Sequence, residues 1–585
     1  MLSTLLVPQC IHAQAADFET ATEAVKNMKV GINLVNTLDC NSGDVNWMWI
    51  EAWTNRTPTD YETAWGGNPV TRADLMKMWR KAGYHAVRVP VTWYPHTGKI
   101  VIKMVKNEKG EKCPTWDMAT WEGYDIDPVW MKRVHEVVDY VIDQGMYCIL
   151  NVHHDTGDYS TSWLRADADN YEQNHERFEA IWRQIAEEFK DYDDHLLFEG
   201  YNEMLDKFGS WGYASLMNST GYDEDYARSS NKALNDYAQS FVNVVRSTGG
   251  NNLYRNLVVN TYCGTSGGME PLTEIKVPQD EVDGHLLIGV HAYYTFASLE
   301  TNKNTFDNTI QDLNTYLVPK GVPIIVSEWG TNEKKENREA ACDFAHYFME
   351  KTRANGLAVF DWSGVVSYGK FRSLPAFDHS AFVVATMKGY YGDNYVPVLL
   401  TRDDYDDEGK RKQFVHTVEY NTKWSELNLF SDDVPLKMKN YKGLRVVFAE
   451  PVSNDNFHIK VYGDDNTVED YLGLETGLTT TILFKPAKFT KNVTRVTLQY
   501  NKEGTEQAKV VSAWLIRQDG TEEYSDLSTF WGCTITSKEP YVTGISNVTI
   551  DWTVSNTRIF NLAGQRLSKP QKGINIIEGK KVVVK

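Results

Sequence analysis

Two glutamates at the ends of apolar runs could share acid–base chemistry. The stretch LLFEGYNEM (196–204) passes from a buried-strand pattern into Asn202 and Glu203, and PIIVSEWG (323–330) leads in the same way to Glu328. One carboxyl group of such a pair can donate a proton to a leaving oxygen, while the other stays ionised as a nucleophile. When they lie about 5–5.5 Å apart, the pair can cleave a glycosidic bond through a covalent sugar intermediate. The two glutamates are far apart in the sequence, so only the fold can bring them together.

Further polar and aromatic residues stand at the ends of other apolar runs. They are Arg88 in AVRVPVTW, His153, His154 and Asp155 in ILNVHHD, His291 and Tyr293 in IGVHAYY, and Trp362 in VFDWSG. Taken alone, each has an ordinary explanation as an ion pair, a satisfied core histidine or a packed ring. Their joint position at successive run ends is what predicts a site.

The elements that must position these residues alternate between short strands and amphipathic helices. The predicted strands are 31–34, 86–91, 147–152, 196–201, 257–260, 286–290, 323–326 and 358–362, and the clearest helices are 71–83, 127–145 and 337–356. Each of these helices has apolar residues at i, i+3 and i+4 and a closing glycine. Eight such units predict an α/β fold, a (β/α)₈ TIM barrel whose strand ends face the ligand. A doubly wound open sheet is the alternative, but no GxGxxG follows the first strand.

The pattern changes after the predicted barrel, which spans 26–400. Residues 401–411 are charged and predict a linker, and 412–545 hold alternating strands without a long helical pattern. This region predicts a β-sandwich that either binds carbohydrate or braces the barrel. A short β-rich unit, 546–585, follows it. Residues 1–25 are either a signal-peptide remnant, with an A-x-A pattern but no basic start, or an N-terminal arm.

Composition restricts the classes of partner. The 585 residues carry a formal charge of −19, which argues against nucleic acid, because that partner needs a basic surface. The 18 tryptophans and 32 tyrosines suit a polysaccharide, since flat rings stack on sugars. The seven cysteines form no CxxC pair, so neither a zinc site nor a disulfide framework is predicted, although one bridge stays open. No run approaches the roughly 20 apolar residues of a membrane span, and we expect a monomer.

A metal-dependent barrel hydrolase is an alternative interpretation. Its ligands would come from His153, His154, Asp155, Glu203, His291 and Glu328. Such a barrel is expected to place a His-x-His pair on the first strand, and residues 31–34 contain no histidine. We therefore expect neither a metal nor a cofactor.

In order along the chain, the motifs resemble glycoside hydrolase family 5, and within it the endo-β-glucanase branch. The resemblance covers about 26–395 and rests on GINLVNTLD (31–39), ETAWGGNP (62–69), VRVPVTW (87–93), ILNVHHD (149–155), LLFEGYNE (196–203), HAYY (291–294), PIIVSEWG (323–330) and FDWSG (360–364). Val35, Met204 and the DWSG ending depart from the family pattern. These departures bear on the shape of the sugar subsites and therefore on substrate preference.

The resemblance implies a role for each site residue. Glu203 is the general acid/base and Glu328 the nucleophile. The implied supporting residues are Arg88 and Tyr293, which hold the nucleophile, His153 beside His154 after the third strand, Asn202 for the sugar 2-hydroxyl, His291 as partner of Tyr293 on the sixth strand, and Trp362 as the stacking platform.

Residues outside these motifs are expected to shape a cleft. Outer sugar subsites or plain loop packing would use Trp47, Trp49, Trp53, Trp65, Tyr94 and His96. Insertions at 97–126 and 204–228 would build the walls of a cleft suited to an endo-acting enzyme.

The implied function is that of a retaining endo-β-1,4-glucanase of cellulase type, acting on cellulose-type or mixed-linkage β-glucans without a cofactor. The alternatives are the same mechanism on xyloglucan, mannan or xylan, and a non-catalytic glycan-binding protein. The end of the chain, with IFNLAGQRLSKPQKGINII and KKVVVK, resembles a type IX secretion sorting domain. That likeness implies a secreted or cell-surface protein.

Overall fold

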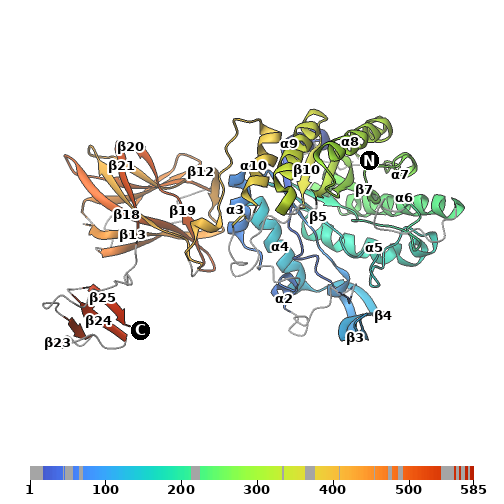
Figure 1. Ribbon diagram of the computed structural model, residues 1–585, viewed down its shortest axis with the longest axis horizontal. Helices are drawn as coiled ribbons and strands as arrows, with labels where there is room; N and C mark the ends of the chain where they lie inside the picture. The colour runs from blue at the N-terminus through green and yellow to red at the C-terminus, as the bar shows by residue number, and fades with distance from the viewer. Residues whose placement is uncertain are drawn as a thin grey trace, which may run out of the picture. The chain divides into compact units, whose positions relative to one another are not determined.

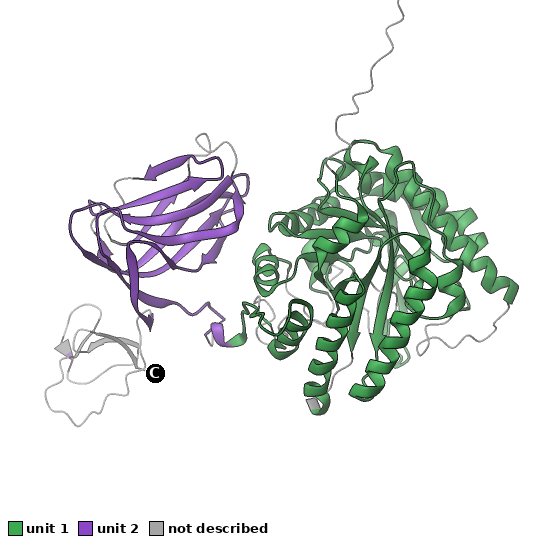
Figure 2. Ribbon diagram, turned by 90° about the horizontal axis from the view of Figure 1, so that it is seen from above, with its two compact units in different colours: residues 1–402 green, residues 403–585 purple. Residues whose placement is uncertain are grey.

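The computed structural model of the chain contains two compact units, residues 1–402 and 403–585 (Figure 2). The described residues are 18–584, apart from 42, 44, 47–56, 65–69, 212–223, 332–334, 363–375, 378, 407–408, 453–454, 472–476, 485–491, 542–558, 562–565, 568–572 and 578–579. The first 17 residues, including the signal-like pattern, lie outside this set. The predicted linker and the predicted separate unit at the end of the chain stay predictions.

The first unit contains a closed barrel of parallel strands in the order β1-β10-β9-β8-β7-β6-β5-β2. The strands are β1 (Val30–Asn33), β2 (Ala86–Val89), β5 (Tyr147–Asn151), β6 (Leu196–Glu199), β7 (Leu257–Thr265), β8 (Leu286–Tyr294), β9 (Ile324–Thr331) and β10 (Ala358–Asp361). The predicted TIM barrel is thus confirmed, with all eight predicted strands in it. The open-sheet alternative is wrong, because β10 pairs with β1 and closes the ring.

Helices surround the barrel on its outside (Figure 1), except that the first one covers the amino ends of the strands. They are α1 (Ala21–Met28), α2 (Pro58–Glu62), α3 (Ala73–Ala82), α4 (Pro128–Ile142), α5 (Ala168–Glu188), α6 (Glu224–Ser247), α7 (Met269–Glu274), α8 (Leu299–Asp312), α9 (Arg338–Ala354) and α10 (Ser380–Tyr391). α3 ends at Gly83, whose φ of 117° favours glycine. α4 begins with Asp127 as its N-cap and a proline in its first turn. The three helices predicted most clearly therefore begin and end within a few residues of the expected positions.

The barrel interior is apolar at one end and polar at the other. Ala24, Val25 and Met28 of α1 pack with the first inward-facing residues of the strands, among them Leu197 and Ala358. Successive inward positions are two residues apart on a strand, so the next layer contains Arg88, Asn151, Glu199 and Asn260, all buried. This polar layer lies towards the carboxyl ends of the strands, the end at which barrels of this kind bind ligands.

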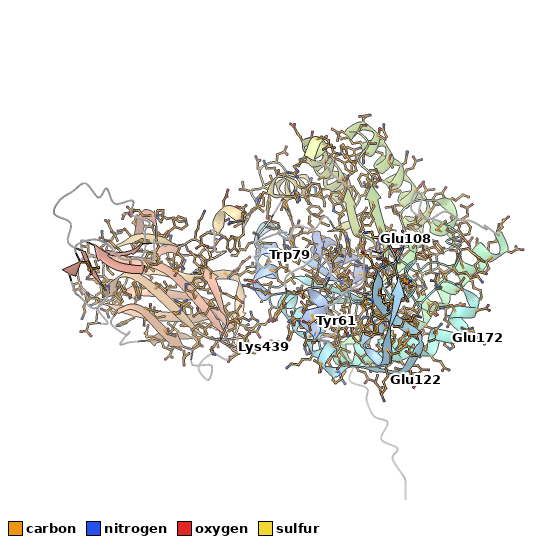
Figure 3. All side chains as sticks on the ribbon, turned by 60° about the horizontal axis from the view of Figure 1, so that its bottom comes forward. Tyr61, Trp79, Glu108, Glu122, Glu172 and Lys439 are labelled. Carbon is orange, nitrogen blue, oxygen red and sulfur yellow. The ribbon has the colours of Figure 1, made fainter. Side chains whose placement is uncertain are left out.

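The predicted insertion 97–126 forms a long β-hairpin, β3 (Thr97–Lys106) paired with β4 (Lys112–Ile126). It follows β2, so it leaves the barrel at the carboxyl end of the strands. Glu108 lies in the hairpin turn and Glu122 on β4 (Figure 3). The Glu108 N–H donates to Oδ1 of Asn46 at 2.9 Å, which joins the turn to the loop that follows β1. At the base, Arg177 of α5 lies 3.9 Å from the ring centre of Trp121.

The second unit is β-rich, as predicted, and two sheets enclose its core. One has the order β16-β13-β18-β11-β21, with β19 on β18, and the other is β15-β14-β17-β12-β20. Their bounds are β11 (Phe414–Tyr420), β12 (Glu426–Lys437), β13 (Tyr441–Val452), β14 (Phe457–Gly463), β15 (Val468–Tyr471), β16 (Gly477–Leu483), β17 (Asn492–Tyr500), β18 (Glu506–Arg517), β19 (Glu522–Ser525), β20 (Ser528–Trp531) and β21 (Cys533–Pro540). Leu427 and Leu498 of one sheet pack with Leu444 and Val510 of the other. A further sheet, β23-β22-β24-β25, contains β22 (Ile559–Asn561), β23 (Arg566–Leu567), β24 (Gly573–Ile577) and β25 (Lys580–Val584).

In the part of the chain that the structure describes, the six cysteines are all free thiols. No helix among the described residues is both long enough and apolar enough to cross a bilayer.

Candidate active site

The carboxyl ends of the barrel strands bring the predicted site residues together. The strands of the closed barrel run parallel, so the carboxyl ends of β6, β8 and β9 lie at the same mouth. Arg88 lies in β2, His153 and His154 follow β5, Asn202 and Glu203 follow β6, His291 and Tyr293 lie in β8, Glu328 lies in β9, and Trp362 follows β10.

The two glutamates of the opening pattern are close neighbours. A carboxylate oxygen of Glu203, one of Glu328 and a ring nitrogen of His291 all lie within 4.8 Å of one another. This spacing fits the roughly 5–5.5 Å of carboxyl pairs that form a covalent sugar intermediate, and is shorter than the 6.5–9.5 Å of pairs with a water between them. The two environments differ, because the side chain of Glu203 is 30% exposed and that of Glu328 only 5%.

Glu328 is held on both of its oxygens. Arg88 Nη1 donates to Oε1 at 2.7 Å, and the Tyr293 hydroxyl donates to Oε2 at 2.6 Å. Burial raises the pKa of Glu328 above its ordinary value, while the charges of His291 and Arg88 oppose that rise. The carboxylate is therefore fixed in direction by donors that favour its ionised form.

Arg88 is itself held by a carboxylate that the sequence analysis missed. Glu199 accepts from Arg88 Nε at 2.7 Å and from Nη2 at 2.6 Å, and both side chains are buried. Asn151 and Asn260 each donate to Oε1 of Glu199. Burial alone would raise the pKa of Glu199, but Arg88 outweighs it and holds that pKa below its ordinary value. A charged residue inside the apolar run LLFE was the available signal, since such a residue is rarely buried unless it is paired.

Asn202 has its amide orientation set by the same arginine. Its Oδ1 accepts from Arg88 Nη2 at 2.8 Å. The amide oxygen is thus engaged inside the protein, and the amide nitrogen becomes the group available to donate to a ligand.

His291 connects the two glutamates. Its Nδ1 lies 2.8 Å from Oε1 of Glu203 and 3.5 Å from Oε2 of Glu328. Burial lowers the pKa of His291, but the two carboxylates raise it above its ordinary value overall. Gly264 supports the ring from β7: a Cβ there would lie 2.8 Å from Cγ of His291, and its φ of 65° also favours glycine. No pattern in the sequence predicts this role for Gly264.

The histidines after β5 have different surroundings. The ring of His153 stacks on Trp362, with centroids 5.6 Å apart and planes 11° apart. Burial, with the nearby charges of His154 and Arg88, lowers the pKa of His153 well below its ordinary value. His154 lies 3.5 Å from Oδ2 of Asp39. His153 is therefore buried and packs face to face on Trp362, whereas His154 contacts the loop after β1.

The six residues of the metal alternative fall into separate groups. Glu203, His291 and Glu328 form one cluster, whereas His153 and His154 cluster with Asp39. Asp155 belongs to neither cluster and accepts from three donors of the protein, namely Trp93 N, Tyr94 N and Trp163 Nε1. The structure thus separates the set on which that interpretation depended.

Two of the proposed outer-subsite residues are packed inside the protein. Tyr94 is fully buried, and His96 stacks on Trp130 with ring centres 3.6 Å apart. The loop-packing alternative is therefore correct for both. The four tryptophans of that prediction, Trp47, Trp49, Trp53 and Trp65, lie outside the described residues.

Comparison with known proteins identifies the barrel. The family model "Cellulase (glycosyl hydrolase family 5)" matches residues 43–365. Endoglucanase A of Clostridium longisporum is 31% identical over 366 residues, 60% of this chain and 61% of that protein, so this chain spans less than two thirds of that relative's length.

Solved structures agree with this assignment. A GH5-4 broad specificity endoglucanase from an uncultured bacterium is 43% identical with a TM-score of 0.54, covering 64% of this chain and 96% of that one. PbGH5A from Prevotella bryantii B14 is 35% identical with a TM-score of 0.52, covering 64% and 99%. Because the family model matches more than half of the sequence, the chain belongs to glycosyl hydrolase family 5, the cellulase family.

Proposed function

We propose that this protein is a retaining endo-β-1,4-glucanase in which Glu203 is the general acid/base and Glu328 the nucleophile. The observation that carries the proposal is the approach of their carboxylate oxygens to within 4.8 Å at the mouth of the barrel. The relatives named endoglucanase support the choice of reaction.

In the first step, a Glu328 oxygen bonds to the anomeric carbon while the bond to the leaving oxygen breaks. The proton for that oxygen comes from Glu203, whose partial exposure suits contact with substrate. Arg88 and Tyr293 fix the attacking carboxylate, and Asn202 donates to the 2-hydroxyl. In the second step, Glu203 takes a proton from water, the water oxygen bonds to the same carbon, and Glu328 is released.

Removal of each glutamate tests the assignment. Glu328→Ala should lower hydrolysis of barley β-glucan and carboxymethylcellulose by several orders of magnitude, since no covalent intermediate can form. Azide and an activated aryl β-glycoside then separate the two roles. Glu328→Ala should give the α-glycosyl azide, because azide takes the place of the nucleophile, and Glu203→Ala should give the β-glycosyl azide. Near wild-type hydrolysis by Glu328→Ala, or the same anomer from both variants, would overturn the proposal.

The polysaccharide remains a choice among related backbones. A mutant of PbGH5A, 34% identical to this chain with a TM-score of 0.51, was solved with the xyloglucan tetradecasaccharide XXXGXXXG. Xyloglucan is therefore the second candidate, ahead of mannan and xylan. A reducing-sugar panel on these polymers should give the highest rate with an unbranched or mixed-linkage β-glucan. Binding to these polymers without release of any product would favour the alternative of a non-catalytic glycan-binding protein.

We also propose that the protein is exported, acts as a monomer, and carries a sorting unit in residues 546–585. The support is the IFNLAGQRLSKPQKGINII and KKVVVK pattern, which resembles a type IX sorting domain. Deletion of 546–585 in a host with that pathway should leave the enzyme inside the cell. Light scattering of the purified chain should give the mass of one copy.

A further inference from the structure

The outer face of the five-stranded sheet in the second unit carries polar side chains that are almost fully buried. Leu427, Leu498 and Ile459 are register partners across β12, β17 and β14 and pack in the core. Because neighbouring residues of a strand point to opposite sides, the adjacent positions face outwards. These outward positions form two rows, Glu426–Gln499–His458 and Asn428–Thr497–Lys460.

Glu426 organises this face through neutral donors. The Tyr462 hydroxyl donates to its Oε2 at 2.8 Å, Thr497 Oγ1 to the same oxygen at 2.8 Å, and Gln499 Nε2 to its Oε1 at 2.7 Å. Lys460 Nζ lies 4.0 Å from Oε1 and balances the charge. The hydroxyl and amide groups around Glu426 are therefore held in fixed orientations, and Lys460 partly balances its charge.

Two polar atoms on this face are buried and lack a hydrogen-bond partner within the described residues. They are Oδ1 of Asn428 and Nε of Arg495. Asn428 is 6% exposed, and its register partner is Thr497 in the middle of the face. An unsatisfied buried polar group is unfavourable, and a hydroxyl-bearing ligand would supply a donor to the amide oxygen.

Aromatic side chains border the same face. Phe530 and Trp531 of β20, the edge strand beside β12, are 43% and 52% exposed, and Trp531 is the register partner of Glu426. The Arg495 guanidinium lies 3.7 Å from the ring centre of Phe530 and links this border to β17. Exposed rings beside oriented amides match the two surfaces of a sugar, which has apolar ring faces and polar hydroxyl edges.

We propose that this face binds a neutral β-linked glucan chain, at a site separate from the catalytic barrel. The chain would run across the strands from Trp531 on β20, over Asn428 and Gln499, towards Lys460 on β14. Adjacent strands are spaced roughly 4.8 Å apart, close to the length of one hexose, so each strand would face about one sugar. The choice of β-glucan rests on the proposed function of the barrel, whereas the presence of a sugar site rests on this face alone.

Affinity electrophoresis of the full chain in gels containing barley β-glucan tests the proposal. The Glu328→Gln background prevents digestion of the gel, and Trp531→Ala and Asn428→Ala are compared in it with Trp514→Ala. Trp514 is a matched control because it lies in the other sheet, next to the core residues Ala513 and Leu515. Trp531→Ala and Asn428→Ala should each weaken apparent affinity about tenfold, which is 1.4 kcal/mol, while the control keeps the parental value.

The same substitutions are also made in the active chain. Its rate of hydrolysis of a short soluble β-glucan oligosaccharide should not change, because the barrel alone performs this reaction. Retardation equal to that of the control in both variants would overturn the glucan site. If the active chain hydrolyses β-glucan but this face does not contribute to retardation, only the glucan site is overturned and the proposed function stands. If this face contributes to retardation but the active chain hydrolyses no β-glucan, the proposed function is overturned instead. Thermal unfolding of Asn428→Ala at the parental temperature would exclude loss of folding as the cause of a weaker affinity.

Discussion

The buried carboxylate of Glu199 offers the sharpest test of how the site is held. Glu199 accepts two hydrogen bonds from Arg88, at 2.7 and 2.6 Å. Glu199→Gln keeps the shape of the side chain but replaces one oxygen with an NH₂ group. That NH₂ group would face an N–H donor of Arg88, so at least one of the two charge-assisted hydrogen bonds between Arg88 and residue 199 is lost. Arg88 would then retain Glu328 as its only anionic partner among these contacts.

The expected cost follows from the burial of both groups. A hydrogen bond to a charged group contributes about 1.5–3 kcal/mol, and removing one partner of a buried ion pair costs about 3–5 kcal/mol. Since the amide oxygen can still accept one bond, we expect the free energy of unfolding to fall by roughly 3 kcal/mol. A displacement of the guanidinium by about 1 Å would also misplace the Glu328 carboxylate, which costs roughly 100-fold in rate.

The assay measures kcat, KM and thermal unfolding of Glu199→Gln on barley β-glucan. We expect the loss to fall on kcat with KM nearly unchanged, because Glu199 lies behind Arg88 and does not line the mouth. Glu62→Gln is the matched control: Glu62 is also buried and accepts from Arg133 at 2.7 and 3.1 Å, but it joins α2 to α4. It should lower stability and leave kcat unchanged. If Glu199→Gln behaves in the same way, Arg88 needs no such support and the reasoning is wrong.

Three further outcomes are expected. Tyr293→Phe removes a donor that lowers the pKa of Glu328, so that pKa should rise further and the acid limb of the kcat/KM profile should move to higher pH. The shift should be about one unit, equivalent to 1.36 kcal/mol, and a limb that stays in place or moves to lower pH would refute it. Gly264→Ala should reduce kcat by about tenfold or more by displacing His291, whereas Gly110→Ala, with a similar positive φ but open space around it, should not. Equal rates for these two variants would exclude the steric effect. Treatment with EDTA should leave hydrolysis unchanged, since both proposed chemical steps use side chains alone, and loss of activity restored by a divalent ion would favour the metal alternative.

The predicted part of the site consists of residues at the ends of strands. A polar residue such as Glu203 or Glu328 interrupts an apolar run, and eight runs in alternation with helices define a barrel. The barrel then places these residues at one mouth, although the chain separates them widely. The pattern of runs does not say which side chains touch, because that depends on the order of the strands in the sheet. The contact of Tyr293 with Glu328 was therefore expected only through the family resemblance.

The unpredicted part lies inside the barrel and in irregular backbone. Whether Glu199 or Asn260 points inwards depends on closure of the sheet, which no local pattern records. The pairing of β7 with β8 is irregular between Asn260 and Thr265, and this irregularity brings Gly264 against His291. The sequence reveals neither the extra residues in that pairing nor the contact that they create.

The position of Arg88 links stability of the barrel to reactivity at its mouth. Burial alone would lower the pKa of Arg88, but Glu199 and Glu328 raise it above its ordinary value, so the arginine stays charged in the polar layer. Of the two carboxylates that share Arg88, Glu328 is the more exposed and lies closer to the mouth. A barrel with an apolar pair in place of Glu199 and Arg88 would avoid the cost of burying these charges. It would also lose the donor that fixes the Glu328 carboxylate, which is why we expect stability and kcat to fall together at Glu199 and not at Glu62.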